Sequence, residues 1–161
     1  MPLEIREAST ADVDTIVDIL IATKEASLLG LITDHDRDKS FWTERWHKYL
    51  SEGSSAQQSR GDGFALIAEE GGRPLGFAAY HHTSRHDTDV ELESIHVLKM
   101  AQRRGVGTAL LREVIGRLVT AGDRSMCVGY DPLNPYKAFY LKHGAAEINP
   151  HWAVWRGIHL F

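Results

Sequence analysis

Cysteine is nearly absent from this chain, and so are long apolar runs. The single Cys127 cannot form an internal disulfide, and no CxxC or paired zinc spacing occurs among the 161 residues. No apolar run approaches the roughly 20 residues that span a membrane, and charges at Glu4, Arg6 and Glu7 interrupt the region where a signal peptide needs an apolar core. We therefore expect a cytoplasmic protein in a reducing compartment, with no membrane partner.

An excess of basic residues is also missing. The chain has 18 Lys and Arg against 22 Asp and Glu, a formal net charge of −4. A nucleic-acid binder normally carries a basic face, so we expect no nucleic-acid partner. The length is that of one domain, residues 1–161, and no repeat or low-complexity segment divides it.

What the chain does contain is one informative stretch, from Val90 to Leu111. It begins as a run of strand formers to Leu98, continues through the turn 102–107, and becomes helical in its apolar spacing from Thr108. A strand, a glycine turn and a helix direct free backbone N–H groups at an anion, and the helix dipole adds positive charge there. The pattern predicts a phosphate cradle, to which the two arginines 103 and 104 add attraction.

Spacing separates the known phosphate cradles. A P-loop needs Lys-Ser/Thr after its second glycine, and nothing of the kind follows Gly105. A dinucleotide fingerprint needs a third glycine where Leu110 stands. What remains is Gln-x-x-Gly-x-Gly-Thr/Ala after a strand, present here as ESIHVLKMAQRRGVGTALL. This segment resembles the pyrophosphate loop of the GNAT N-acetyltransferase superfamily, whose members use acetyl-CoA.

The resemblance implies a fold and a cosubstrate site. The expected fold is α/β: a mixed, mostly antiparallel sheet of six to seven strands flanked by about four helices. In the family the fourth strand splays from the fifth, and its backbone polarises the acetyl carbonyl. Carried onto this chain, the expected acetyl-CoA contacts are Ile95, His96, Val97, Gln102, Arg103, Arg104, Gly105, Val106, Gly107 and Thr108. No metal is expected.

The remaining elements follow from periodicity and turn signals. The expected strands are 3–7, 64–69, 75–81 and 125–129, with extended structure from 145 to 161. Four helices are expected: one that starts after Ser9, and three over residues 39–52, 108 to about 120, and 135–143. Residues 53–63 are predicted to form a mobile loop.

The segment from Asn134 to Gly144 carries a second resemblance to the family. It is similar to the family pattern N-x-x-A-x-x-F-Y-x-x-x-G, although the interval between the asparagine and the alanine differs by one residue. By that resemblance Asn134 contacts the cofactor and Tyr140 protonates the departing sulfur. A phenol with a pKa of about 10 is protonated at neutral pH, so it can donate. The alternative for Tyr140 is a helix tyrosine packed against the sheet.

The amine that accepts the acetyl group must lose a proton. Keeping a lysine-like amine neutral at pH 7 costs roughly 4–5 kcal/mol, so a nearby base is needed. Glu93 is the best candidate: under strict alternation it shares a face of its strand with Glu91, Ile95 and Val97, opposite His96. A bulge in this strand would change that parity, and a solvated acid at the strand end is the alternative.

Three other groups have two interpretations each. Trp42 and Trp46 form either an aromatic acceptor pocket or an ordinary core stripe of their helix. His82 and His86 have the spacing of a zinc pair on a helix, but their segment is not helical, so a structural turn is favoured. Cys127 lies mid-strand, which favours a buried structural thiol over a nucleophile and therefore direct transfer.

The sequence thus predicts an N-acetyltransferase that moves acetyl from acetyl-CoA directly to a primary amine of a small molecule or peptide. The alternative is a catalytically inactive domain that binds or senses acyl-CoA. The acceptor is not identified by the sequence. A homodimer stays open, because the apolar stretch with Trp152 and Trp155 fits either the core, which is favoured, or a subunit contact.

Overall fold

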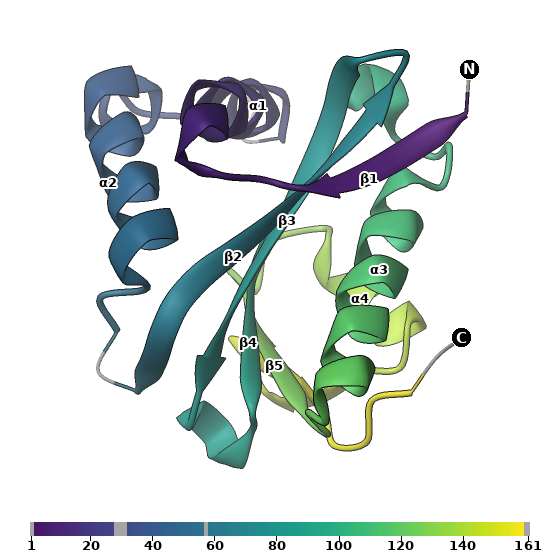
Figure 1. Cartoon of the computed structure of the whole chain (residues 1–161). Helices are drawn as coiled ribbons and strands as arrows, with labels where there is room; N and C mark the ends of the chain where they lie inside the picture. The colour runs from purple at the N-terminus through teal and green to yellow at the C-terminus, as the bar shows by residue number, and fades with distance from the viewer. Residues whose placement is uncertain (1, 28–31, 57, 160–161) are drawn as a thin grey trace.

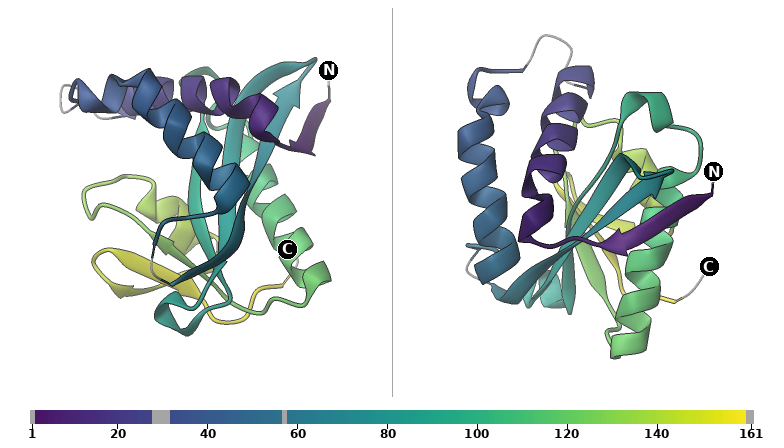
Figure 2. Two further views of the ribbon diagram at one scale, coloured as in Figure 1. Left: turned by 60° about the vertical axis from the view of Figure 1, so that its left-hand side comes forward. Right: turned by 45° about the horizontal axis from the view of Figure 1, so that its top comes forward.

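The structure is a computed structural model that describes residues 2–27, 32–56 and 58–159, and it contains one twisted sheet with helices on both faces. Helices α1 (Val13–Ser27) and α2 (Lys39–Glu52) cover one face, and α3 (Val106–Ala121) with the short α4 (Lys137–Lys142) lies on the other (Figure 1, Figure 2). The expected mixed α/β fold is confirmed. No helix in these ranges is both long and apolar enough to cross a membrane.

Seven strands form the sheet, in the order β1-β2-β3-β4-β5-β7-β6. Every neighbouring pair is antiparallel except β4 and β5, which are parallel and joined through α3. A parallel pair needs such a crossover because the chain must return to the same end of the sheet. The strands are β1 (Leu3–Glu7), β2 (Ser59–Glu70), β3 (Arg73–Thr83), β4 (Val90–Val97), β5 (Met126–Gly129), β6 (Ala146–Asn149) and β7 (Trp152–Trp155).

The helix ends follow from local capping. Ser9 and Asp12 form a capping box ahead of α1, and the Asp38 carboxylate accepts from the Phe41 N–H at 3.1 Å at the start of α2. Helix α3 lies between Gly105 and Gly122, which both adopt positive φ angles, 82° and 90°. The sequence therefore fixes these boundaries through side chains and glycines close to each end.

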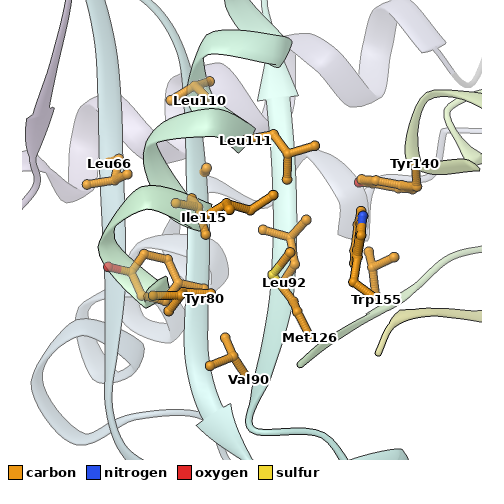
Figure 3. Close-up of a cluster of buried hydrophobic side chains, with 14 of the residues drawn as sticks. Leu66, Tyr80, Val90, Leu92, Leu110, Leu111, Ile115, Met126, Tyr140 and Trp155 are labelled. Atoms are coloured by element: carbon orange, nitrogen blue, oxygen red, sulfur yellow. The ribbon is translucent and has the colours of Figure 1, made fainter. Parts of the chain in front are cut away.

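Two hydrophobic clusters fill the layers on either side of the sheet. The cluster under α1 and α2 contains Ile16 and Val17 with Trp46 and Phe77. The cluster under α3 contains Leu110, Leu111, Ile115, Leu92, Met126, Tyr140 and Trp155 (Figure 3). Trp155 is 5% exposed, so it belongs to the core, whereas Trp152 is only half-buried.

The structure corrects three expected boundaries. Strand β2 begins at Ser59, inside the stretch 53–63 that was predicted to be a loop, and a bulge separates this start from Phe64. Ser59 and Arg60 lie beyond the end of β1 and pair with Thr83 and His82 of β3, before the register break that leads to Phe64. Helix α3 starts at Val106, two residues before its predicted start, and α4 starts at Lys137, two residues after its predicted start. The end of the predicted extended segment, residues 160–161, lies outside the described residues.

Candidate active site

The sheet opens between β4 and β5. Among the described residues, these strands pair at Val90–Met126, Glu91–Cys127 and Leu92–Val128, after which β4 continues to Val97 and none of these residues forms a partner strand on that side. On its other side β4 stays paired with β3 through Val97. The splayed fourth strand expected from the resemblance is therefore present, and Glu93 is the first residue of β4 beyond the fork.

Backbone N–H groups are available along the open edge. The Leu98 N–H donates to the Leu75 carbonyl of β3 at 2.8 Å. Because successive N–H groups point to opposite sides of a strand, the Val97 N–H points into the fork. The N–H therefore faces the open edge, and donation by the amide near Val97 to the acetyl carbonyl stays a prediction.

The loop after β4 is held in place by Gln102. Its side-chain N–H₂ donates to the Val97 carbonyl at 3.1 Å and to the Tyr136 hydroxyl at 3.0 Å. The Gln102 side chain therefore ties the loop to the end of β4 and to the segment before α4. Gly105 and Arg103 both have positive φ angles, 82° and 63°. The first N–H groups of α3 have no partner within the helix, so this turn fits a phosphate group.

The two arginines of the loop differ in their surroundings. Arg104 pairs with Glu70 at the end of β2, with 3.2 Å between Nη2 and Oε2. Arg103 is exposed, and none of the described residues forms an ion pair with it. Further into the helix, Gly107 packs against the Phe139 ring, and the Thr108 hydroxyl lies 3.2 Å from Nε2 of His143. Arg103 is therefore the cation of this loop that stays available to an anion.

Tyr140 lies in α4 with its ring in the core next to β4 (Figure 3). Burial raises the pKa of its phenol to about 12, while a hydrogen bond from the Ile95 backbone N–H acts in the opposite direction. The phenol thus keeps its proton at neutral pH and lies at the open edge of β4. The structure therefore shows the packing against the sheet, and the role of Tyr140 as proton donor stays a prediction.

Asn134 shapes the turn that leads into α4. Its side-chain oxygen accepts from the Tyr136 N–H at 2.8 Å, and its backbone carbonyl accepts from the Lys137 N–H at 3.3 Å. This Asx turn explains why α4 starts later than predicted. A contact between Asn134 and a cofactor stays a prediction.

The predicted shared face of Glu91 and Glu93 is confirmed, but the predicted relation of Glu93 to Ile95, Val97 and His96 is wrong. Ala79 pairs with Ser94 and Tyr80 with Leu92, so Glu93 is an extra residue in a β-bulge. Beyond the bulge, Ile95 and Val97 pack into the cluster under α3. Glu93 and Glu91 lie on the opposite face with His96, toward α1 and α2. The bulge inverts the alternation on which the prediction depended.

His96 is held in that layer as a neutral ring. Its Nδ1 lies 2.8 Å from the Thr23 hydroxyl of α1, and its ring stacks on Phe77 at 5.2 Å between centroids. Burial lowers the pKa of His96 to about 4, with a small further effect from Lys24. The side chain of His96 thus anchors β4 to α1, while its backbone lies on the side of β4 that pairs with β3.

A pocket of about 300 Å³ lies between α2 and the open half of β4. Trp46 lines it, while Trp42 does not: the Trp42 indole N–H donates to the Asp36 carbonyl at 3.2 Å outside the pocket. Trp46 is also 6% exposed and packs on Phe77, so the core interpretation of this tryptophan holds, and its contact with an acceptor stays a prediction. The lining residues are Phe41, Glu44, Arg45, Trp46, Lys48, Tyr49, Gly53, Ser54, Ser55 and Glu93.

Two carboxylates line this pocket, Glu44 from α2 and Glu93 from β4. Burial raises the pKa of Glu93, and the neighbouring charge of Glu91 raises it further, against smaller opposite effects of His81 and Arg45. A raised pKa makes a carboxylate a stronger base than it is in water. Glu93 thus combines access to the pocket with the basicity that removal of an amine proton requires.

Sequence reasoning missed the partners of Glu93. His81 of β3 is fully buried, with one ring nitrogen 3.6 Å from each of Glu91 and Glu93, and the Tyr49 hydroxyl of α2 lies 3.0 Å from Nδ1. His81 was assigned to the end of a strand followed by a turn, whereas β3 continues to Thr83. The sequence did contain one signal for this cluster, because His81 is a histidine at the end of an otherwise apolar strand.

The other reactive candidates are separate from this site. His82 points to Asp123 at 3.2 Å, while His86 stacks on Trp152, so the described residues do not bring the two together as a metal pair. Cys127 is fully buried, and burial raises the pKa of its thiol to about 11. A structural thiol is the interpretation that fits both observations.

Comparison with known proteins gives one family and many similar folds. The sequence profile of the Acetyltransferase (GNAT) family matches residues 28–145. A PaiA N-acetyltransferase from Thermoplasma acidophilum, solved with coenzyme A, is similar with a TM-score of 0.74 and 16% identity, over 96% of this chain and 98% of that one. A GNAT-family acetyltransferase from Brucella melitensis with acetyl-CoA has a TM-score of 0.65 and 20% identity, over 99% and 92%.

A third similar structure is an aminoglycoside acetyltransferase from an uncultured soil metagenomic sample. It has a TM-score of 0.63 and 21% identity, over 92% of this chain and 95% of that one. Among curated protein sequences, none matches the chain. The three structures are similar in fold, and each is too distant in sequence to identify the acceptor.

Proposed function

The chain belongs to the GNAT acetyltransferase family, and we propose on this basis that it transfers acetyl from acetyl-CoA directly to a primary amine of a small molecule or peptide. The observation that carries the proposal is the fork between β4 and β5. A turn whose geometry suits a phosphate group lies at one end of its open edge, the Tyr140 phenol with its raised pKa lies beside it, and Glu93, whose pKa is also raised, lies at its start.

The fork and the following turn would hold the cosubstrate. Bound acetyl-CoA supplies an acetyl group activated as a thioester. The N-terminal amides of α3 and the Arg103 side chain would bind the pyrophosphate. The Val97 N–H would donate to the acetyl carbonyl oxygen, where negative charge develops during transfer. Gly105 supports this assignment, because its left-handed conformation opens the turn without a side chain in the way.

Tyr140 would act as the acid. Its phenol keeps a proton at neutral pH, because burial raises its pKa to about 12. The hydroxyl also lies at the Ile95 amide, on the edge that would carry the reacting group. We therefore assign to Tyr140 the donation of its proton to the departing thiolate.

Glu93 would act as the base. It lies at the fork on the face of the sheet that carries the pocket, so an amine in the pocket would approach the open edge of β4 from that side. Its raised pKa favours removal of the amine proton. The acid and the base then act from opposite faces of the sheet.

The pocket supports an amine acceptor with both apolar and polar parts. Phe41, Trp46 and Tyr49 give it aromatic walls, and Glu44 and Glu93 give it acids that attract a cationic amine. Arg45 and Lys48 add positive charge at the same opening. Because one similar structure is an aminoglycoside acetyltransferase, amines with several amino groups belong in the panel of acceptors.

The test is thiol release from acetyl-CoA across a panel of amines, together with calorimetric titration with CoA. The panel includes amino acids, polyamines, aminoglycosides, arylalkylamines and peptides with a free N-terminus. We expect release with one class of amine, reduced by about tenfold or more in Tyr140→Phe. Tyr130→Phe is the matched control, because its phenol stacks beside Tyr140 but donates to Glu147.

Two other results would contradict the proposed transfer. Binding of CoA with no thiol release from any amine would favour the domain that binds or senses acyl-CoA without catalysis. Absence of CoA binding would contradict the assignment of the turn at residues 102–108 as a pyrophosphate site.

A further inference from the structure

His81 has its imidazole enclosed between two carboxylates next to the pocket. The ring projects from β3 and is fully buried, and Glu91 and Glu93 of β4 flank it. Nε2 lies 3.6 Å from Oε1 of Glu91, and Nδ1 lies 3.6 Å from Oε2 of Glu93. Only Glu93 of these three lines the pocket, so the arrangement runs from the pocket into the interior.

Tyr49 determines which ring nitrogen carries the proton. Its hydroxyl lies 3.0 Å from Nδ1, and burial with the charges of Glu93 and Glu91 raises the pKa of the phenol. Tyr49 therefore keeps its proton, and because Nδ1 is the hydrogen-bond partner of its buried hydroxyl among the described residues, we take the hydroxyl as the donor. The proton of a neutral His81 ring then lies on Nε2, facing Glu91, and Nδ1 is the nitrogen that can accept a further proton.

The two carboxylates have different charge environments. Glu91 faces the guanidinium of Arg85, with 3.0 Å between Nε and Oε1, so its negative charge is already compensated. Glu93 has no such contact among the described residues; Arg45 acts on it more weakly than burial and Glu91 do. Of the two, Glu93 is therefore the group that exchanges a proton, and Glu91 is the fixed negative charge on the far side of the ring.

We propose that His81 is a positioning residue for the proton of the acceptor amine: it takes this proton from Glu93 at Nδ1, with Glu91 and Arg85 fixing the opposite edge of the ring. The proposal rests on the acetyl transfer proposed above. As the N–C bond to the acetyl group forms, the amine N–H bond breaks and the proton moves to Glu93. The new O–H bond then breaks as an N–H bond forms at Nδ1, which regenerates the carboxylate and leaves an imidazolium between two negative charges.

The distances agree with such a relay and define what must move. At 3.6 Å, Glu93 and Nδ1 are slightly farther apart than in a hydrogen bond, so a small rotation of the Glu93 side chain closes the gap. The Tyr49 hydroxyl competes for the same nitrogen and must turn away when the proton arrives. Tyr49 also lines the pocket, so a bound acceptor can offer its hydroxyl another partner.

The same three side chains fit a metal ion less well, although their ligand atoms lie within 4.8 Å of one another. A metal ion needs lone pairs that converge on one point. Here the imidazole separates the carboxylates, because Glu93 approaches its Nδ1 edge and Glu91 its Nε2 edge. Arg85 also neutralises Glu91 already, which removes part of the attraction for a cation.

The first experiment compares His81→Gln with His82→Gln in the full chain. His82 is the adjacent residue of β3, but it is half-buried and contacts Asp123 instead of the pocket. We expect kcat to fall by about tenfold or more in His81→Gln, with a changed pH profile and CoA affinity within about twofold of the wild type. His82→Gln should keep the wild-type profile. Equal profiles for the wild type and a folded His81→Gln would overturn the proposal.

The second experiment does not depend on activity. The protonation of the His81 ring is followed by NMR of ¹⁵N-labelled histidine across pH 5–9, in the wild type and in Glu93→Gln. We expect the midpoint of the His81 titration to move to lower pH by at least about half a unit when the Glu93 charge is removed. An unchanged midpoint would overturn the coupling between Glu93 and His81, even if the protein releases thiol from acetyl-CoA. A midpoint that moves as expected would support this coupling, even if no acceptor amine has been found.

A titration with Zn²⁺ tests the metal interpretation directly. We expect the wild type and His81→Gln to bind Zn²⁺ equally weakly. Zn²⁺ binding at micromolar concentration that His81→Gln abolishes, together with loss of thiol release on chelation, would replace the relay with a metal site.

Discussion

Thr23 and His96 join helix α1 to the open half of β4. The Thr23 hydroxyl lies 2.8 Å from Nδ1 of His96, and it also lies 2.9 Å from the Leu20 carbonyl. A hydroxyl has one proton, which it donates to Leu20, so His96 must be the donor through Nδ1–H. This bond holds a neutral histidine against the strand whose backbone is assigned to the acetyl group.

The neutral state of His96 makes folding stability depend on pH. Its pKa is lowered to about 4 in the folded protein, against about 6.5 when unfolded, so the unfolded chain binds more protons between these values. Stability is therefore fully present above about pH 6.5 and is lost as pH falls toward 4, by up to about 3 kcal/mol.

This dependence can be measured by urea unfolding at several pH values, with His96→Gln as the comparison. The variant lacks the titrating ring, so its stability should change less between pH 6.5 and pH 4 than that of the wild type. Parallel curves for the two proteins would show that His96 does not stay neutral on folding.

Glu93→Gln should lower thiol release while the protein keeps its fold. The amide cannot accept a proton, so we expect a loss of about tenfold to a hundredfold in kcat. In the wild type, activity should rise with pH as Glu93 ionises, in a range moved upward by its raised pKa. Glu44→Gln is the control, since Glu44 lines the same pocket from α2. Equal losses in both variants would argue for general attraction of a cationic amine over proton removal.

Gly105→Ala should weaken CoA binding through backbone strain. Its φ of 82° is unfavourable for a residue with a Cβ, at about 1–2 kcal/mol, although an added Cβ would meet no atom within 4 Å. Gly72 in the β2–β3 turn has a φ of 78° and equally open surroundings, so Gly72→Ala is a close control. Both variants should lose similar stability in thermal unfolding, but calorimetry should detect weaker CoA binding only in Gly105→Ala.

Arg103→Ala should reduce CoA affinity more than Arg104→Ala. Arg103 has no ion pair among the described residues and lies at the proposed pyrophosphate site, so we expect a loss of roughly tenfold. Arg104 already pairs with Glu70 on the surface, and its removal should cost less than about threefold. Calorimetric titration at two salt concentrations measures both effects, and a larger loss for Arg104→Ala would reverse the assignment.

The fold and the strand–turn–helix unit after β4 could be predicted because their signals are local. The strand, the glycines 105 and 107 and the apolar spacing of α3 lie within one stretch of the sequence. The prediction for Tyr140 likewise came from a short segment, residues 134–144, through its resemblance to the family pattern. Each of these predictions needed only residues that are close together in the chain.

The faces of β4 could not be predicted because they depend on its partner. The bulge at Glu93 appears only when Ala79 and Tyr80 of β3 are set against Ser94 and Leu92. The contact of His81 with both glutamates likewise requires the register of two strands and the position of α2. A single sequence contains the side chains for this cluster but not the pairing that brings them together.

The fork between β4 and β5 also has a mechanical consequence. Three residue pairs, Val90–Met126 to Leu92–Val128, form the whole hydrogen-bonded seam between the half-sheet β1–β4 and the half-sheet β5–β7–β6. Under force, such a short seam is the weakest line across an otherwise continuous sheet. A molecule that bridges the fork would act as a clamp across this line, so the protein should resist pulling apart more strongly when it is loaded than when it is empty.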